Sequence, residues 1–180
     1  MKQINAGPRR RILIVDGYNV INVRKPVRES LILEDARRLL TERLHDYAGW
    51  TDQQVILVYD AWLSNRMQRS VEKKGLLTVV FTMKGETADN YIERVCDGYE
   101  EDIALRRAEV RVATSDLVEQ TVAFGRGAIR LSSRELIREM DEAQESRGGR
   151  VTSKSTRGST VADRVPADVR EKLEKMRRGE

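Results

Sequence analysis

Hydrophobic residues along this chain alternate between short apolar runs and longer stretches in which they recur at helical spacing. Five short runs, rich in leucine and β-branched residues, predict β-strands. They cover residues 11–15, 55–59, 76–81, 110–113 and 128–131. Three of these runs are almost entirely apolar, as expected for parallel strands that are buried on both faces.

Helices are predicted between these strands. Apolar residues recur at helical spacing over residues 33–47 and again over 88–103. A shorter helix is expected to begin near Asp116, and another just after Ser132, where Glu135 three residues later completes a capping box. Strands that alternate with helices are typical of an α/β fold with a parallel sheet.

The C-terminal segment has a different pattern. Residues 147–165 combine Gly, Ser, Thr and basic side chains with almost no apolar periodicity, which indicates a flexible linker. Pro166 suits the first position of a short terminal helix. We therefore expect one α/β domain over residues 1–146, a linker over 147–165 and a helix over 166–180.

Composition narrows the possible chemistry. The chain has 180 residues, with one cysteine and one histidine, so an internal disulfide and a cysteine-built or histidine-rich metal site are excluded. Catalysis would have to use carboxylates, hydroxyls, lysines or a hard metal ion. No apolar run approaches the ~20 residues that span a membrane, and the N-terminus lacks the apolar core of a signal peptide. We expect a cytoplasmic protein without a membrane partner.

The net charge of +4 is concentrated at the C-terminus. Residues 147–180 carry ten Lys or Arg against five Asp or Glu, which leaves the first 146 residues with a net charge of −1. A basic tail is typical of proteins that bind an anionic partner, nucleic acid first. It is equally typical of a segment that only keeps the protein in solution.

Acidic residues stand where the predicted strands end. Asp16 ends the first strand, Asp60 ends the second, Asp116 follows the fourth, and Asp89 opens the second long helix. Sites in open parallel sheets form outside the carboxyl ends of the strands, so these four acids are expected to converge on one edge. Glu86 could join them as a ligand, support a ligand, or be a charge at a helix start.

Clustered carboxylates repel one another, and a divalent cation such as Mg²⁺ or Mn²⁺ is the usual remedy. Such a cation can activate water for attack at phosphorus. An aspartate after a strand can also be a helix cap or a turn residue, so each acid keeps both interpretations.

Polar residues near these acids are candidates for substrate contact. Asn19 could orient a ligand or bind phosphate, or could be a turn residue. Thr114 and Ser115 could bind phosphate or cap a helix. Arg69 and Lys73 belong to a polar, basic segment after the second strand, which we expect to be a loop facing RNA or a larger partner.

The motifs VDGYNVIN, VYDA, GETADNYIERV, VATSD and SSRELIREM, in this order, resemble those of the YacP-like NYN-domain nucleases, relatives of the PIN-domain ribonucleases. The resemblance runs from residue 11 to residue 140, and the ending EKLEKMRRGE is similar too. It implies a three-layer α/β/α sandwich with strand order 3-2-1-4-5. It also implies a metal-dependent endoribonuclease that associates with the ribosome and cleaves translated mRNA. Carried over residue by residue, the acidic site is Asp16, Asp60, Asp89 and Asp116, with Asn19 beside it.

Three functions fit these observations. The first is an endoribonuclease that uses Mg²⁺ or Mn²⁺ to cleave single-stranded mRNA on the ribosome. The second is a non-catalytic module that binds RNA or the ribosome; it explains less well why four carboxylates would be kept together. The third is another α/β phosphohydrolase, which is disfavoured because Asp16 is followed by GYN and not by a second aspartate two residues on. A monomer is favoured.

Overall fold

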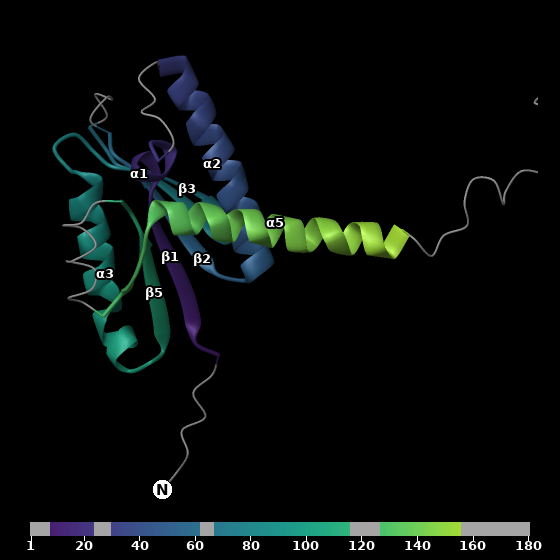
Figure 1. Ribbon diagram of the computed structural model, residues 1–180. Helices are drawn as coiled ribbons and strands as arrows, with labels where there is room; N and C mark the ends of the chain where they lie inside the picture. Colours follow the sequence, from purple (N-terminus) through teal and green to yellow (C-terminus); the bar gives the residue numbers. More distant parts are fainter. Residues whose placement is uncertain (1–7, 24–29, 62–66, 116–126, 156–180) are drawn as a thin grey trace, which may run out of the picture. The chain divides into compact units, whose positions relative to one another are not determined.

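The computed structural model describes residues 8–23, 30–61, 67–115 and 127–155 (Figure 1). The chain divides into two compact units, Met1–Ala143 and Gln144–Glu180. The sheet and the helices packed on it belong to the first unit. The described part of the second unit is the continuation of helix α5 (Ser133–Ser155).

A six-stranded sheet in the order β3-β4-β2-β1-β5-β6 forms the centre of the first unit. Its strands are β1 (Arg10–Asp16), β2 (Gln54–Tyr59), β3 (Ser70–Lys74), β4 (Leu77–Phe81), β5 (Ala108–Ala113) and β6 (Ile129–Leu131). Five strands are parallel, and β3 alone is antiparallel, paired with β4 at one edge. The five predicted strands are β1, β2, β4, β5 and β6, in the predicted order, so the predicted fold class is confirmed.

Strand β3 is an addition to the predicted sheet. It lies within the polar, basic segment that was expected to be a loop, and its side chains are half-buried or exposed. A strand at the edge that is solvated on both faces needs no alternation of apolar residues, so its sequence carries no strand pattern. Gly75, at φ 58°, supplies the left-handed backbone of the tight turn into β4.

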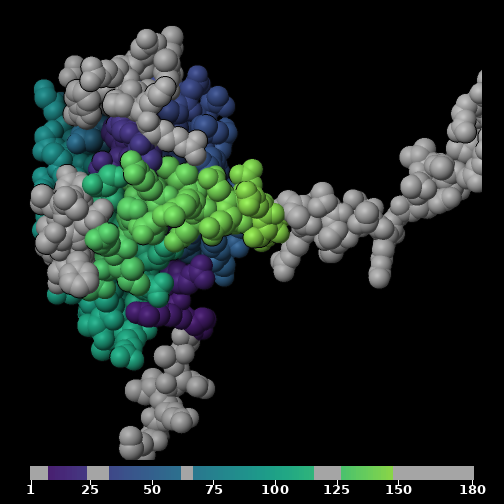
Figure 2. All heavy atoms as spheres, in the orientation of Figure 1, coloured from purple at the N-terminus to yellow at the C-terminus, as the bar shows by residue number. Residues whose placement is uncertain are grey.

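The two faces of the sheet are covered by different helices. Helix α2 (Ser30–Thr51) and the first turns of α5 pack on one face, which Figure 2 shows in space-filling form, and α3 (Ala88–Ala104) packs on the other. Along β1, Leu13 and Val15 pack in the core under α2 and α5, whereas Ile12 and Ile14 pack in the core under α3. All four side chains are fully buried, as expected for a central strand between two helical layers.

The predicted helices over residues 33–47 and 88–103 correspond to α2 and α3, and the helix after Ser132 corresponds to α5. The capping box is present: Glu135 N–H donates to Ser132 Oγ at 3.2 Å, and Ser132 N–H donates to Glu135 Oε2 at 2.7 Å. The helix predicted near Asp116 lies outside the described residues. None of the helices in the described ranges is long and apolar enough to cross a membrane.

Helix α5 extends further than the sequence indicated. It continues to Ser155, so residues 147–155 of the expected linker are helical. The remainder of the expected linker and the expected terminal helix over 166–180 lie outside the described residues, and these domain boundaries stay a prediction.

Candidate active site at the carboxyl ends of the strands

Asp16 sits at the end of β1 and caps the short helix α1 (Gly17–Ile21). Its Oδ1 accepts a hydrogen bond from the Asn19 backbone N–H at 3.1 Å, and its Oδ2 accepts one from Asn19 Nδ2 at 2.6 Å. The same Asn19 amide donates to Thr114 Oγ1, just beyond β5, at 3.1 Å. Asn19 therefore joins the ends of two neighbouring strands and fixes the orientation of the Asp16 carboxylate.

A tight turn after Asp16 brings α1 against the end of β2. A Cβ atom on Gly17 would lie 2.2 Å from Cε1 of Tyr59, whose side chain is fully buried. Tyr59 is itself held in place, because its hydroxyl donates to the Arg37 carbonyl of α2 at 3.2 Å. Only glycine fits at position 17, so the Asp-Gly pair of the DGYN motif has a steric reason.

The environment of Asp16 opposes its ionisation. Only 6% of the residue is exposed. Burial raises the pKa of Asp16, and the negative charge of Asp89 raises it further, although the hydrogen bonds from Asn19 act in the opposite direction. The charge of Asp89 thus acts on Asp16 in the same direction as burial.

Asp60 directly follows β2, and its side chain lies at the start of α3. Its Oδ2 accepts a hydrogen bond from the backbone N–H of Ala88, the first residue of α3, at 3.4 Å. Thr87 caps the helix through its Oγ1, which accepts from the Asn90 N–H at 3.2 Å. Asp60 thus faces the positive end of the helix that carries Asp89 in its first turn.

Glu86 stands three residues before Asp89 and is held by two arginines. Its carboxylate accepts from Arg69 Nε at 3.1 Å and from Arg69 Nη2 at 2.6 Å, and it also pairs with Arg94. Burial alone would raise the pKa of Glu86, but the hydrogen bonds from the two arginines outweigh burial and lower it. Because both of its oxygens are engaged by guanidinium groups, Glu86 is a supporting residue and not a candidate ligand.

The donors at this edge are carboxylate, amide and hydroxyl oxygens, a set that suits a hard cation such as Mg²⁺ or Mn²⁺. Within residues 8–23, 30–61, 67–115 and 127–155, no three Asp, Glu, His or Cys side chains are grouped so that they could hold a metal ion. Asp16 and Asp89 form an interacting pair, and Asp60 joins the same helix start. The fourth predicted acid, Asp116, lies outside the described residues, so the four-acid cluster stays a prediction.

The predicted substrate-contacting residues fall in different environments. Thr114 is fully buried and accepts from Asn19, whereas Ser115 is exposed at the same strand end. Lys73 is exposed on β3. Arg69 is engaged by Glu86, an interaction that the sequence did not predict.

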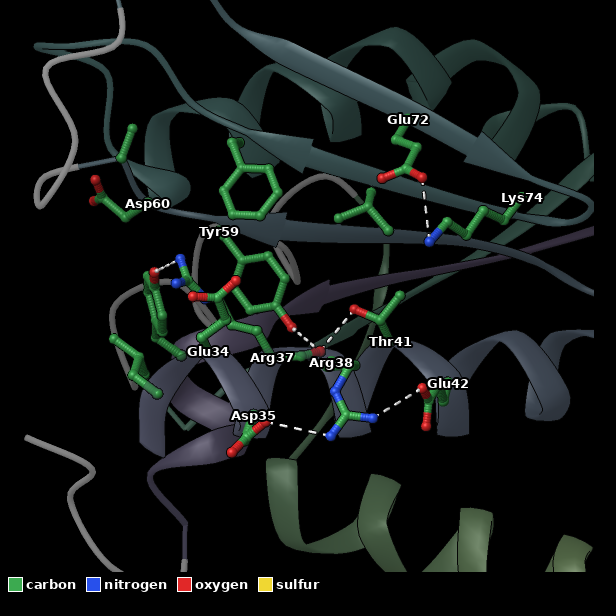
Figure 3. Close-up of a pocket in the computed structure, with 15 residues that line it drawn as sticks. Glu34, Asp35, Arg37, Arg38, Thr41, Glu42, Tyr59, Asp60, Glu72 and Lys74 are labelled. Atoms are coloured by element: carbon green, nitrogen blue, oxygen red, sulfur yellow. Dashed lines mark hydrogen bonds and ion pairs between the residues drawn. The ribbon is translucent and has the colours of Figure 1, made fainter. Parts of the chain in front are cut away.

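A cavity of about 760 Å³ adjoins the site on the side of α2 and β4 (Figure 3). Asp60 and Tyr59 line it together with charged side chains of α2 and β3. Many of these charges pair with one another: Arg38 with Asp35 at 3.3 Å and with Glu42 at 3.6 Å. The described lining contains five acidic residues and three basic ones, so this surface attracts phosphate groups weakly.

Comparison with known proteins identifies the family to which this chain belongs. Residues 13–178 match the YacP-like NYN domain, and the chain belongs to that family. The NYN domain is one of the PIN-like nuclease folds, whose members generally use divalent metal ions.

Individual relatives agree with this family over nearly the whole chain. The uncharacterized protein YacP of Bacillus subtilis (strain 168) is 34% identical over 174 residues, which cover 94% of this chain and 98% of YacP. A crystal structure of Rae1 (YacP) from Bacillus subtilis has a TM-score of 0.62 at 34% identity, covering 93% of this chain and 95% of Rae1. A tryptophan-to-leucine mutant of the same protein has a TM-score of 0.67 at 33% identity, covering 94% and 96%.

Proposed function

We propose that this protein is a divalent-metal-dependent endoribonuclease that cleaves single-stranded mRNA in association with the ribosome. The observation that carries the proposal is the buried Asp16 carboxylate, oriented by Asn19 and coupled to Asp89 at the strand ends of a nuclease fold. A buried acid with a raised pKa beside a second acid is typical of a functional site.

Each side chain has a proposed task. Asp16, Asp60, Asp89 and Asp116 would hold Mg²⁺ or Mn²⁺, which when bound supplies an activated water and neutralises charge on the phosphate. Asn19 keeps Asp16 in one orientation, and the buried Thr114 hydroxyl keeps Asn19 in place. This arrangement reduces the reorganisation that the site would need during the reaction.

The surface around the site explains why a larger partner is proposed. The cavity next to Asp60 is lined by more acidic than basic side chains among the described residues, and aromatics make up only 5% of the sequence. Free RNA would therefore be held weakly, by either phosphate contacts or base stacking. A ribosome that presents the mRNA would compensate, with Lys73, Ser115 and the basic C-terminal segment as contact candidates.

Cleavage of a labelled single-stranded RNA tests this proposal. Wild-type protein should cleave it with Mn²⁺ and lose activity with chelator, whereas Asp16→Asn and Asp89→Asn should cleave it far more slowly than wild type. Asp52→Asn is the matched control, because Asp52 is exposed and precedes β2, at the amino end of that strand and away from the candidate site. Its left-handed backbone, at φ 50°, also accepts asparagine. Cleavage by Asp16→Asn at the wild-type rate would contradict the proposed site.

A second function is a non-catalytic module that binds RNA or the ribosome. It is favoured by one observation: residues 147–180 carry ten Lys or Arg against five Asp or Glu, as is typical of a segment that binds an anionic partner. Cleavage assays carried out beside co-sedimentation with ribosomes separate the two functions. The module predicts that wild type and Asp16→Asn both bind ribosomes, and that neither cleaves mRNA on ribosomes or free in solution with Mn²⁺.

A further inference from the structure

We propose that Glu86, clamped by Arg69 and Arg94, is a positioning residue that fixes the start of α3 and thereby the place of Asp89 in its first turn. The inference rests on the proposed nuclease function and assigns Arg69 a different task from the substrate contact that the sequence suggested. Arg69 acts through Glu86 and not on RNA. We call these three residues the Glu86 clamp.

The Glu86 clamp is built from a buried acid and two partly exposed bases. The side chain of Glu86 is 5% exposed, against 32% for Arg69 and 56% for Arg94. Arg69 binds in the two-pronged manner that matches a guanidinium to a carboxylate. Both guanidinium groups also lie over the ring of Tyr91, at 4.8 Å for Arg69 and 5.6 Å for Arg94 from the centroid.

The clamp acts on the chain that leads directly into the site. Gly85, at φ 83°, turns the backbone after β4, and the Glu86 N–H then donates to the Met83 carbonyl at 3.0 Å. The Met83 N–H donates in return to the Glu86 carboxylate at 3.4 Å. Glu86 is thus held by its backbone and its side chain just before the Thr87 cap.

The position of α3 along its axis depends on this anchor. The Ala88 N–H faces the Asp60 carboxylate, and Asp89 follows in the first turn of α3. Arg69 belongs to the segment that enters β3, so the clamp connects the edge of the sheet to the start of α3. If Glu86 loses its charge, both arginines lose their common partner, and the start of α3 loses the ion pairs that supplement the Thr87 cap and the Asp60 contact.

The role of Arg69 can be decided by kinetics and salt dependence. A positioning role predicts that Arg69→Gln and Glu86→Gln each lower kcat for a short RNA, by about 10-fold to 100-fold as for other misplaced catalytic groups, with KM unchanged. The slope of RNA affinity against salt should also be unchanged, whereas a lost phosphate contact would flatten it by about 0.7. The double variant should be no slower than either single variant, because both remove the same clamp.

Glu100→Gln is the control for these variants, since Glu100 is exposed on the same helix. Arg69→Lys keeps the charge but not the two-pronged geometry, and we expect it to lose part of kcat while remaining folded. It keeps the test decisive if Glu86→Gln unfolds. A raised KM with a flatter salt slope in Arg69→Gln would overturn the proposal, as would an unchanged kcat in Arg69→Gln and Glu86→Gln.

Hydrogen exchange tests the clamp without any cleavage. In Glu86→Gln, the amides of Ala88, Asn90 and Tyr91 at the start of α3 should exchange about 10-fold faster, as expected when a charged hydrogen bond is lost. The amide of Leu105, bonded to Glu101 at the other end, should be unchanged. Equal acceleration at both ends, or none, would overturn the positioning role. If wild type cleaves no RNA, the proposed function fails, and this measurement still decides the inference.

Discussion

Asp16 and Glu86 are two buried carboxyl groups. Asp16 ends β1 and Glu86 lies between β4 and α3, and their exposed fractions are nearly the same, 6% and 7%. Asp16 accepts hydrogen bonds from the neutral groups of Asn19 and faces the charge of Asp89. Glu86 accepts hydrogen bonds from two guanidinium groups. The pKa is raised for Asp16 and lowered for Glu86, so burial alone does not decide the charge of a carboxyl group.

The difference indicates different tasks for the two acids. The charge of Glu86 is already balanced within the protein, and its ion pairs serve to hold the start of α3. The charge of Asp16 is oriented by Asn19, while burial and the charge of Asp89 both oppose its ionisation. A buried acid of this kind is destabilising until a cation or a proton compensates it, which is the usual condition of a metal ligand before the metal binds.

The largest expected effect separates activity from stability at Asp16. Asp16→Asn should lower kcat for RNA cleavage by roughly 100-fold to 1000-fold, as is typical when one electrostatic group is removed from an active site. The same variant should be at least as stable as wild type without metal, because a buried charge and its repulsion by Asp89 disappear. Urea denaturation beside the cleavage assay measures both. A large loss of stability would show that the Asp16 charge is balanced in the folded protein.

At Glu86 the expected effect on stability has the opposite sign. Glu86→Gln leaves two arginines without their partner, and we expect a loss of about 1–3 kcal/mol in the free energy of unfolding. The loss should fall at the lower end, because Arg94 is already 56% exposed and can be hydrated. Urea denaturation with Glu100→Gln as control is the measurement. Equal stability of Glu86→Gln and wild type would mean that the ion pairs only offset the cost of burying the acid.

The contributions of Asp16 and Glu86 to stability should also depend on pH with opposite signs. The folded pKa of Glu86 is below its ordinary value of 4.5, so its stabilisation is present above pH 4.5 and is lost as the pH falls through the folded pKa. The folded pKa of Asp16 is above its ordinary value of 3.8, so its unfavourable contribution is present at neutral pH and is relieved as the pH falls through the folded pKa.

Lowering the pH should therefore bring the stability of each variant closer to that of wild type, from above for Asp16→Asn and from below for Glu86→Gln. The advantage of Asp16→Asn over wild type and the deficit of Glu86→Gln should both shrink on acidification. Thermal unfolding from pH 7 to well below pH 4.5 at constant salt checks this. A deficit of Glu86→Gln that grows as the pH falls would contradict the lowered pKa.

The smallest expected effect concerns Thr114. Thr114→Val keeps the shape of the side chain but removes the oxygen that accepts from Asn19 Nδ2 at 3.1 Å. We expect a loss of about 1 kcal/mol in unfolding free energy and a modest decrease in kcat, because Asn19 is less well oriented. Asn19→Ala should exceed it, since Asn19 supplies the side-chain hydrogen bond to Asp16 as well. If Thr114→Val loses more stability and kcat than Asn19→Ala, Thr114 does not act on Asp16 through Asn19.

Much of the fold and part of the site could be predicted from local pattern. The central strands are apolar because both of their faces are covered, and helices α2 and α3 repeat their apolar residues at helical spacing. The places of Asp16 and Asp60 after parallel strands follow from the same pattern, because parallel strands end at one edge. The helix-cap interpretation is present at Asp16, which caps α1, and Asp60 contacts the start of α3, whereas the role of both acids as metal ligands stays a prediction.

Other features left no local signal. Strand β3 is an exposed edge strand, so hydrogen bonding to β4 defines it, and no alternation of apolar residues marks it. Glu86 pairs with Arg69 across 17 positions and with Arg94 across eight, and no helical or strand period connects these positions. Arg69 therefore resembled a solvent-facing base in the sequence, although folding places it on a buried acid.

The sequence by itself determined the family, the parallel sheet and the places of Asp16 and Asp60 where two of its strands end, because each depends on motifs or on periodicity within one element. Only the tertiary structure decided that Glu86 forms ion pairs with two arginines and that Asp16 accepts its hydrogen bonds from Asn19. The carboxyl groups of Asp16 and Glu86 look alike in the sequence until folding supplies Asp89 to the first and Arg69 to the second. Electrostatic interactions depend on distance in space and on exclusion of water, and both are set by elements that are far apart in the chain.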